Sequence, residues 1–204
     1  MRLMESHSEW ALGFEDETWW SRFSMPNLHA WADDGQPLRL VEQSVPNDDP
    51  DQKALACYGL LVRWMTDQGQ FHEETWLRFV DGRPLSQLTT AFLEYSCEKL
   101  EALGKKALLL IWDNASWHLS AQVQEWICQH NQRVKLDSEG VRILECRLPT
   151  KSPWLNPIEP KWIHGKRKVV EADGLLTAQE LAQRVCDAFG CYYEDHLSIP
   201  EKVA

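Results

Sequence analysis

An acidic residue, Asp113, directly follows the apolar run 107–112 (Ala-Leu-Leu-Leu-Ile-Trp). The run predicts a strand that is buried on both faces. In open α/β sheets, ligands bind outside the carboxyl ends of the strands, so a carboxylate here would project into a crevice and could act on a bound ligand. The alternative is that Asp113 or Asn114 only forms the turn after the strand. This segment alone does not decide between the two interpretations.

A second acidic residue, Glu159, lies in the Pro-rich segment 148–162. Asn156 is a good helix N-cap, Pro157 suits the first helical position, and Glu159 sits where a capping-box acid would. Helix capping explains these three residues without any chemistry, but it does not explain Ser152-Pro-Trp-Leu before them or Trp162 after them. A carboxylate in the first turn of a helix is also held firmly, as catalysis requires.

A third group of acids lies near the N-terminus, in Gly13-Phe-Glu-Asp-Glu-Thr18. Such clusters are usually solvated. Here, however, an expected strand over residues 10–16 leads into the acids, and Leu12, Phe14 and Asp16 fall on one face by period-two alternation. A strand that leads into paired acids makes this segment more than a solvated cluster, although it is a weak signal alone.

Hydrophobic periodicity predicts the elements that must position these acids. Strands are expected at 10–16, 38–43, 53–64, 107–112 and 141–148, and helices at 85–103, around 119–127, at 157–170 and at 177–189. The last helix opens with Thr177-Ala-Gln-Glu180, a capping box. Three successive strands predict an antiparallel meander, and the strand–helix alternation after them predicts a mixed sheet.

The predicted fold class is therefore α/β and ribonuclease-H-like: a mixed five-stranded sheet, made of an antiparallel meander plus parallel strands, with helices on both faces. The length of 204 residues suits one domain, and no linker-like composition divides the chain. We expect a single domain over 1–204, with a core over about 10–170 and a C-terminal helix over about 177–190.

Two motifs resemble a known family. Asp113-Asn-Ala-x-x-His118, followed by Ser152-Pro-x-Leu-Asn-Pro-Ile-Glu159-x-x-Trp162, resembles the DDE transposases of the mariner superfamily, in their bacterial insertion-sequence branch. Asp16-Glu-Thr, Trp31, Gly35-Gln-Pro and Gly59 resemble the first-strand region of that family. The resemblance covers roughly residues 10–170, and the second motif is highly specific.

The resemblance implies a DNA endonuclease that cleaves and transfers DNA strands in transposition. By position, the metal-binding and catalytic acids of the family fall on Asp16, Asp113 and Glu159. They would hold two Mg²⁺ or Mn²⁺ ions, with Asp16 as the bridging ligand. Asn114, His118 and Asn156 match positions beside the site, where they would support the ligands or contact phosphate. The implied partners are the DNA element ends and the target DNA.

The sequence departs from the family in two respects. The 45 residues between Asp113 and Glu159 are more than is typical, and we expect the extra length in a polar loop at 131–140. The helix-turn-helix DNA-binding region of the family is not found, which predicts recognition by a separate region or chain, as in relatives encoded by two overlapping frames. A homodimer is also consistent with the resemblance.

The charge distribution bears on DNA binding. The net charge of −10 argues against unaided binding of nucleic acid, but residues 1–52 hold eleven acids and three arginines and so carry most of it. The candidate DNA-binding residues cluster around Glu159; they are Lys151, Lys161, Lys166, Arg167 and Lys168. Each could equally lie on a solvated helix face. Of the eleven tryptophans, Trp117, Trp154 and Trp162 are nearest the motifs and could stack bases or brace loops.

Other features narrow the class of protein. No apolar run is long enough to span a bilayer and the N-terminus shows no signal region, so we expect a cytoplasmic protein. The six cysteines form no C-x-x-C pair and are expected to be reduced, mostly buried thiols. The five-residue steps of Cys186, Cys191 and His196 would scatter them around a helix, which argues against a zinc site.

Three functions remain open from the sequence. The first is an active transposase catalytic domain. The second is a truncated or domesticated inactive remnant that acts as an interaction module, which the acidic N-terminal third favours and the intact acid set disfavours. The third is another nuclease of the same fold, such as a ribonuclease H or a resolvase, against which the Ser-Pro-x-Leu-Asn-Pro-Ile-Glu string argues.

Overall fold

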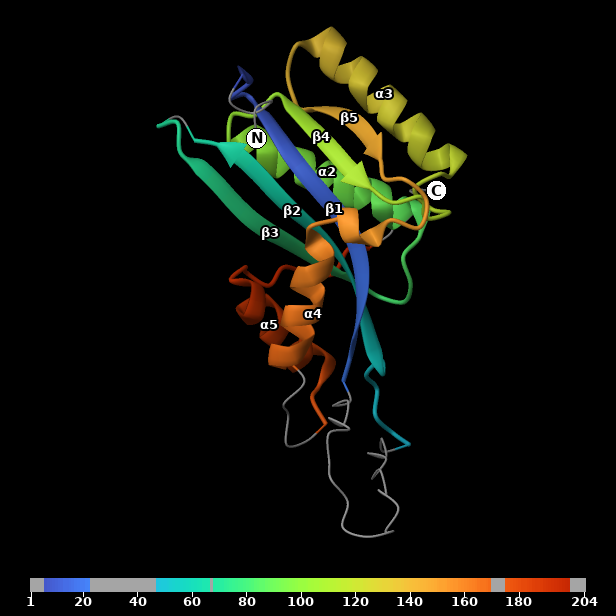
Figure 1. Cartoon of the computed structure of the whole chain (residues 1–204). Coiled ribbons are helices and arrows are strands. Elements are labelled where there is room, and N and C mark those ends of the chain that lie inside the picture. The colour runs from blue at the N-terminus through green and yellow to red at the C-terminus, as the bar shows by residue number, and fades with distance from the viewer. Residues whose placement is uncertain (1–5, 23–46, 67, 170–174, 199–204) are drawn as a thin grey trace.

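The computed structural model describes residues 6–22, 47–66, 68–169 and 175–198 (Figure 1). Five strands form one mixed sheet in the order β3-β2-β1-β4-β5. The strands are β1 (Trp10–Ser21), β2 (Ala54–Met65), β3 (Phe71–Val80), β4 (Ala107–Trp112) and β5 (Arg142–Arg147). The first three form an antiparallel meander, whereas β4 pairs in parallel with both β1 and β5. The predicted mixed five-stranded sheet is confirmed.

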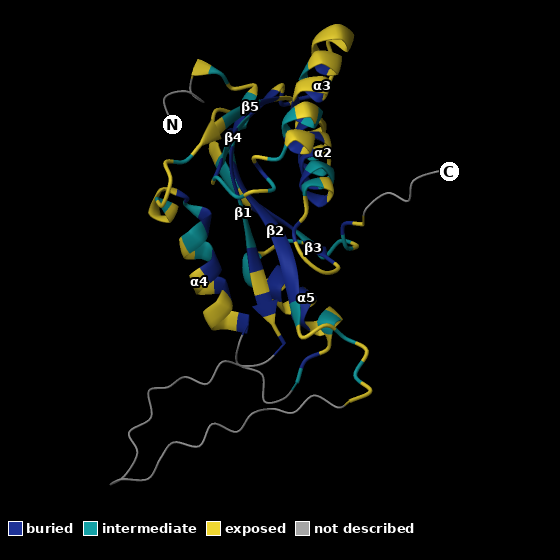
Figure 2. Cartoon of the chain, turned by 90° about the vertical axis from the view of Figure 1, so that its right-hand side faces the viewer, coloured by how far each residue is buried: buried dark blue, intermediate teal, exposed yellow. Residues whose placement is uncertain are grey.

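Helices cover both faces of this sheet (Figure 2). They are α2 (Ser86–Ala102) and α3 (Ala121–Asp137) on one face, and α4 (Ile158–Val169) and α5 (Ala178–Phe189) on the other, with a short 3₁₀ turn, η1 (Pro153–Leu155), before α4. Each face has its own apolar core because successive strand residues point to opposite sides. The predicted capping box of α5 is confirmed: Thr177 and Glu180 exchange bonds at its start.

The strands of the meander differ in part from the prediction. The strand expected at 38–43 lies outside the described residues. The sequence pattern did not indicate β3, which pairs with β2 along its whole length. At one end Phe71 lies opposite Met65, and at the other Val80 lies opposite Ala56. Its first half contains His72, Glu73 and Glu74, and these polar residues mask the alternation. These side chains are exposed or partly exposed, so they need no apolar partner.

The prediction of a polar loop at 131–140 was wrong, because α3 occupies most of this range and ends only at Asp137. Val134 is buried on the inner side of α3. Asn131 also joins the helix to β5: its Nδ2 donates to the carbonyl oxygen of Ile143, and its Oδ1 accepts from the backbone N–H of the same residue, both at 2.8 Å. The polar residues here form the outer face of a helix that packs on an edge strand.

The central strand β1 is longer than predicted and extends past its parallel neighbour. β1 pairs with β4 only from Trp10 to Phe14, whereas its pairing with β2 continues to Ser21. Residues 15–21 of β1 therefore have β2 on one side, and no strand among the described residues pairs with them on the other. This step in the sheet leaves space beside Asp16, and the chain leaving β4 turns into it at Asp113.

Two further expectations concern the described residues. No helix among them is long and apolar enough to cross a membrane. All six cysteines are free thiols: Cys57, Cys97 and Cys186 are buried, Cys191 is partly buried, and Cys128 and Cys146 are exposed.

Candidate active site

The three acids that the sequence singled out line one cavity of about 360 Å³. Asp16 comes from the middle of β1, Asp113 follows the last residue of β4, and Glu159 lies in the first turn of α4. The cavity is also lined by Asn114, Asn156 and residues 148–153. Segments far apart in the sequence thus bring three carboxylates to the step in the sheet.

Asp16 is held by an indole from α4. The Nε1–H of Trp162 donates to Asp16 Oδ2 at 2.9 Å. The ring of Trp162 lies over Gly59, the β2 residue that pairs with Asp16, and a Cβ at Gly59 would lie only 2.3 Å from Trp162 Cη2. The absence of a side chain at Gly59 is therefore what allows the indole to reach Asp16.

Burial and neighbouring negative charge raise the pKa values of two of the three carboxylates. Burial, followed by the negative charge of Glu159, raises the pKa of Asp16 to about 7. Burial and the charge of Asp113 likewise raise the pKa of Glu159. The Trp162 bond opposes the rise at Asp16 but does not cancel it. Two acids with raised pKa values at one cavity are characteristic of a site that is built for a positive charge.

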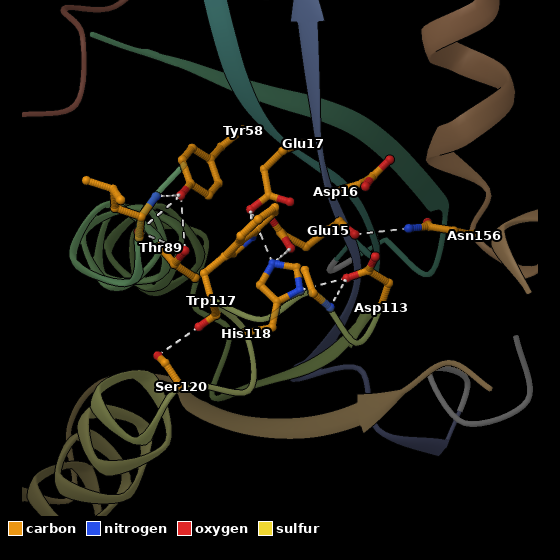
Figure 3. Close-up of polar contacts among 12 residues, drawn as sticks. Glu15, Asp16, Glu17, Tyr58, Thr89, Asp113, Trp117, His118, Ser120 and Asn156 are labelled. Atoms are coloured by element: carbon orange, nitrogen blue, oxygen red, sulfur yellow. Dashed lines mark hydrogen bonds and ion pairs between the residues drawn. The ribbon is translucent and has the colours of Figure 1, made fainter. Parts of the chain in front are cut away.

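Asp113 differs from the other two acids because it is strongly hydrogen-bonded. Its Oδ1 accepts from the Nδ1–H of His118 at 2.9 Å and from the backbone N–H of Ala115 at 2.8 Å (Figure 3). The bond from His118 is the main reason that the pKa of Asp113 lies below its usual range. Asp113 thus forms a turn, as one interpretation expected, and lines the cavity, as the other did.

Two asparagines tie the cavity walls together. The Nδ2 of Asn114 donates to the carbonyl oxygen of Leu148 at 2.8 Å and so joins the end of β4 to the end of β5. The Nδ2 of Asn156 donates to the carbonyl oxygen of Glu15 at 3.0 Å and so fixes the start of α4 to β1 (Figure 3). The backbone N–H of Asn156 donates to Pro153, so the capping-box role considered for Glu159 is not used.

Sequence reasoning missed two acids on the opposite face of β1. Glu15 and Glu17 flank Asp16 but point to the side covered by α2 and α3, where His118 lies between them (Figure 3). Burial and the charge of Glu17 raise the pKa of Glu15 to about 8. Although burial lowers the pKa of His118, the charge of Glu15 and the close contacts with the carboxylates of Asp113, Glu15 and Glu17 raise it to about 12. Strand alternation could have indicated these acids, because Glu15 follows Ala11 and Gly13 on an otherwise apolar face.

The predicted basic residues lie in three places. Lys151 lines the cavity. Lys166, Arg167 and Lys168 are exposed in the last turn of α4. Lys161 is not brought to the acids: its Nζ lies 2.7 Å from Glu73 Oε1, and it lines a different cavity beside β3.

The three tryptophans near the motifs also separate. Trp162 and Trp117 brace acids, because their Nε1–H groups donate to Asp16 and to Glu17, respectively. Trp154, in η1, is 74% exposed. Among these three, only Trp154 presents a largely solvated ring.

The donor set at the cavity fits hard divalent cations. Mg²⁺ and Mn²⁺ prefer carboxylate oxygens and retain several waters, so three acids around an open cavity are sufficient. Among the described residues, a tighter group of possible ligand atoms, all within 4.8 Å of one another, consists of Glu15, Glu17 and His118. That group is buried behind the cavity and shares no residue with the three acids that line it.

Replacing Asp16 with Asn is expected to stabilise the metal-free protein at pH 8 by roughly 1–3 kcal/mol, since one pKa unit corresponds to about 1.4 kcal/mol and relaxation reduces the effect. The folded pKa of about 7 exceeds the ordinary 3.8. The folded state therefore takes up a proton as pH falls through 7. Between pH 8 and pH 6, the free energy of unfolding of the wild type should rise relative to that of the Asp16→Asn variant, so the difference between the two proteins should shrink.

Urea denaturation at both pH values in EDTA measures this. Asp137→Asn, on the exposed end of α3, is the matched control and should show no such difference. Equal stability of Asp16→Asn and wild type at pH 8 would contradict the repulsion described above.

A comparison with protein families gives one match that spans most of the chain. The profile described as "DDE superfamily endonuclease" matches residues 14–181. This range includes all three acids that line the cavity. A comparison with curated protein sequences gives no match.

The chain is similar in fold to solved structures of transposase complexes. The chain is similar to one titled "Mos1 transposase paired-end complex with left transposon end" at 13% identity and a TM-score of 0.54, covering 95% of this chain and 53% of that one. It is also similar to "Crystal structure of the Mos1 mariner paired end complex with Mn" at 12% identity and a TM-score of 0.54. This match covers 95% of the present chain and 54% of the Mos1 chain. The predicted ribonuclease-H-like fold is confirmed. The chain spans about half the length of these structures.

Proposed function

Because the chain belongs to the DDE superfamily endonuclease family, we propose that it is the catalytic domain of a transposase, which cleaves and transfers DNA strands with divalent metal ions. The observation that carries the proposal is the meeting of Asp16, Asp113 and Glu159 at one cavity. The Asp113-Asn-Ala-x-x-His118 and Ser152-Pro-x-Leu-Asn-Pro-Ile-Glu159 motifs support a place in the bacterial insertion-sequence branch of the mariner superfamily.

The three acids would act as the metal ligands. Asp16 would bridge two Mg²⁺ or Mn²⁺ ions, while Asp113 and Glu159 would each complete the ligand set of one. Bound in this way, the metal pair would activate an oxygen nucleophile and stabilise the leaving oxygen of a phosphodiester. The pKa of Asp16, raised to about 7, implies that metal binding near neutral pH releases a proton.

The neighbouring side chains would keep this arrangement in place. Trp162 holds Asp16, Asn156 fixes the start of α4 beside β1, and Asn114 joins the ends of β4 and β5. His118 would orient Asp113 through its 2.9 Å bond. We propose nicking at an element end, followed by in-line attack of the freed 3′-hydroxyl on target DNA.

The proposed partner is DNA, as element ends and as target. The Mos1 titles name transposon ends and strand transfer, which supports this for a chain of the same fold. Since the chain spans about half the length of those structures, we propose that a separate region or chain supplies recognition of the ends, and that the active form is a homodimer. A cytoplasmic location and a single domain over 1–204 remain part of the proposal.

A cleavage assay tests the proposed function. Wild-type protein is incubated with supercoiled plasmid, linear duplex DNA and an RNA–DNA hybrid, each with Mg²⁺, Mn²⁺ or EDTA. We expect nicking of DNA that requires metal. Preferential cleavage of the hybrid would instead indicate a ribonuclease H, and the absence of both cleavage and a saturable Mn²⁺ site would indicate an inactive remnant.

Replacing all three of Lys166, Arg167 and Lys168 by Gln is expected to weaken DNA binding to a similar extent whatever the DNA sequence. Each lysine or arginine that neutralises a phosphate contributes about 0.9 to the slope of log K against log salt, so the slope should fall by up to about 3. These residues are exposed on the helix that carries Glu159.

Fluorescence anisotropy over a salt series measures the slope. The control replaces Arg133 and Lys135, which are exposed on α3. An equal loss of affinity per charge removed in the two variants would show that the effect is only one of net charge.

A further inference from the structure

A cluster of charged groups lies behind Asp113, on the face of β1 opposite to the candidate metal ligands (Figure 3). His118 Nε2 lies 3.2 Å from Glu15 Oε2 and 3.2 Å from Glu17 Oε1. The exposed fractions of the Glu15, Glu17 and His118 side chains are 1%, 7% and 1%. Burying two carboxylates together is costly, so a cluster of this kind requires a specific reason.

The imidazole is held on every side. Its Nε2–H faces the two glutamates, its Nδ1–H donates to Asp113 Oδ1, and its ring stacks on Trp112 with centroids 4.4 Å apart. The Nε1–H of Trp117 donates to Glu17 Oε1 at 2.6 Å and so fixes that carboxylate in turn. A chain of contacts therefore runs from Trp117 through Glu17 and His118 to Asp113.

The chain ends on one oxygen of Asp113. Both donors given above, His118 and Ala115, use Oδ1, and among the described residues no hydrogen bond to Oδ2 is found. The Asp113 side chain is 55% exposed, so packing alone does not fix its rotamer. The bonds from Ala115 and His118 together select the orientation in which Oδ2 remains available for a ligand, and the His118 bond is the one made by a side chain.

We infer that Glu15 and Glu17 are positioning residues for Asp113: together they lock the His118 ring so that it holds Asp113 Oδ1 and leaves Oδ2 to a metal ion. The inference rests on the proposed function, because it takes Asp113 as a metal ligand. Partners behind a ligand that fix its orientation commonly change metal affinity about 10- to 100-fold when they are replaced.

The alternative occupant of the cluster is a cation of its own. The His118 Nε2 and one oxygen each of Glu15 and Glu17 lie within 4.8 Å of one another. Neither oxygen of Glu15 has a hydrogen-bond partner among the described residues. The ion pair of Glu15 with His118 and the bonds at both ring nitrogens favour positioning, and the experiment includes an arm for the cation.

The test measures Mn²⁺ affinity by electron paramagnetic resonance. The variants are Glu15→Gln, Glu17→Gln, His118→Gln and the double variant that combines Glu17→Gln with His118→Gln. Glu125→Gln, on the exposed side of α3, is the control. We expect affinity to fall about 10-fold in Glu17→Gln and to stay unchanged in the control. In the His118→Gln background, Glu17→Gln should cause no further loss, because both act through the same bond.

A second measurement does not depend on metal. Nuclear magnetic resonance of ¹⁵N-histidine-labelled protein should show a His118 Nδ1–H signal that shifts in Glu15→Gln and Glu17→Gln. An additive loss of affinity in the double variant, or an unchanged affinity and His118 signal in both folded single variants, would overturn the inference. If Glu17→Gln does not fold, the same two outcomes are read from Glu15→Gln and from its double variant with His118→Gln.

The remaining outcomes separate the inference from the proposed function. If the wild type has no saturable Mn²⁺ site, both are overturned. If Asp113→Asn loses Mn²⁺ affinity and the glutamate variants keep it, the inference is overturned and the proposed function stands. In an Asp16→Asn, Glu159→Gln background, a Co²⁺ absorption band that His118→Gln removes would assign a cation to the cluster and overturn positioning.

Discussion

Replacing Asp113 with Asn is expected to abolish metal-dependent DNA cleavage, lowering the rate by roughly 10²–10³-fold or more, since it removes a charged group that would stabilise the transition state through the metal. The fold should remain intact. An amide oxygen can still accept from the backbone N–H of Ala115 and the Nδ1–H of His118, the two donors to Asp113 Oδ1. The variant therefore removes charge while it preserves the turn.

The measurement is single-turnover nicking of plasmid DNA in Mg²⁺ and in Mn²⁺, with thermal unfolding as the test of folding. Asp137→Asn changes the same chemical group on the exposed end of α3 and should nick at the wild-type rate. Nicking by a well-folded Asp113→Asn protein at near wild-type rate would remove Asp113 from the metal site and with it the proposed function.

Replacing Gly59 with Ala is expected to damage both stability and activity, although Gly59 does not line the candidate active-site cavity. The new Cβ would lie 2.3 Å from Trp162 Cη2 and 2.6 Å from Cζ2, so the indole must move. Overpacking of this kind costs about 1–3 kcal/mol. The move also breaks the 2.9 Å bond that holds Asp16.

A second-site change makes this prediction specific. Phe in place of Trp162 lacks the atoms that would clash, so Gly59→Ala with Trp162→Phe should recover most of the stability lost by Gly59→Ala. It should not recover full activity, because phenylalanine cannot donate to Asp16. Urea denaturation and nicking rates of the two single variants and the double variant test this. Additive losses of stability would show that the two positions do not meet.

The sequence by itself determined the features that depend on local pattern. The apolar run 107–112 forms a buried strand that delivers Asp113 to the sheet edge, as predicted. Glu159 lies in the first turn of α4, and Thr177 with Glu180 caps α5. Each of these rests on periods of two or 3.6 residues and on bonds between near neighbours, which a single segment encodes completely.

Only the tertiary structure decided which side chains meet across the molecule. Glu15 and Glu17 look like solvated acids in the sequence, yet the chain after β4 brings His118 between them. Lys161 looks like part of a DNA-binding cluster, yet Glu73 on an edge strand neutralises it.

The physical reason is that alternation along a strand fixes which face a residue occupies, but not what covers that face. The cover is set by long-range packing: β1 extends past β4, and α4 crosses its free end, so one acid faces a cavity and its two neighbours face a buried imidazole. The roles of three consecutive acids were therefore decided by the fold, and their positions on opposite faces by the sequence.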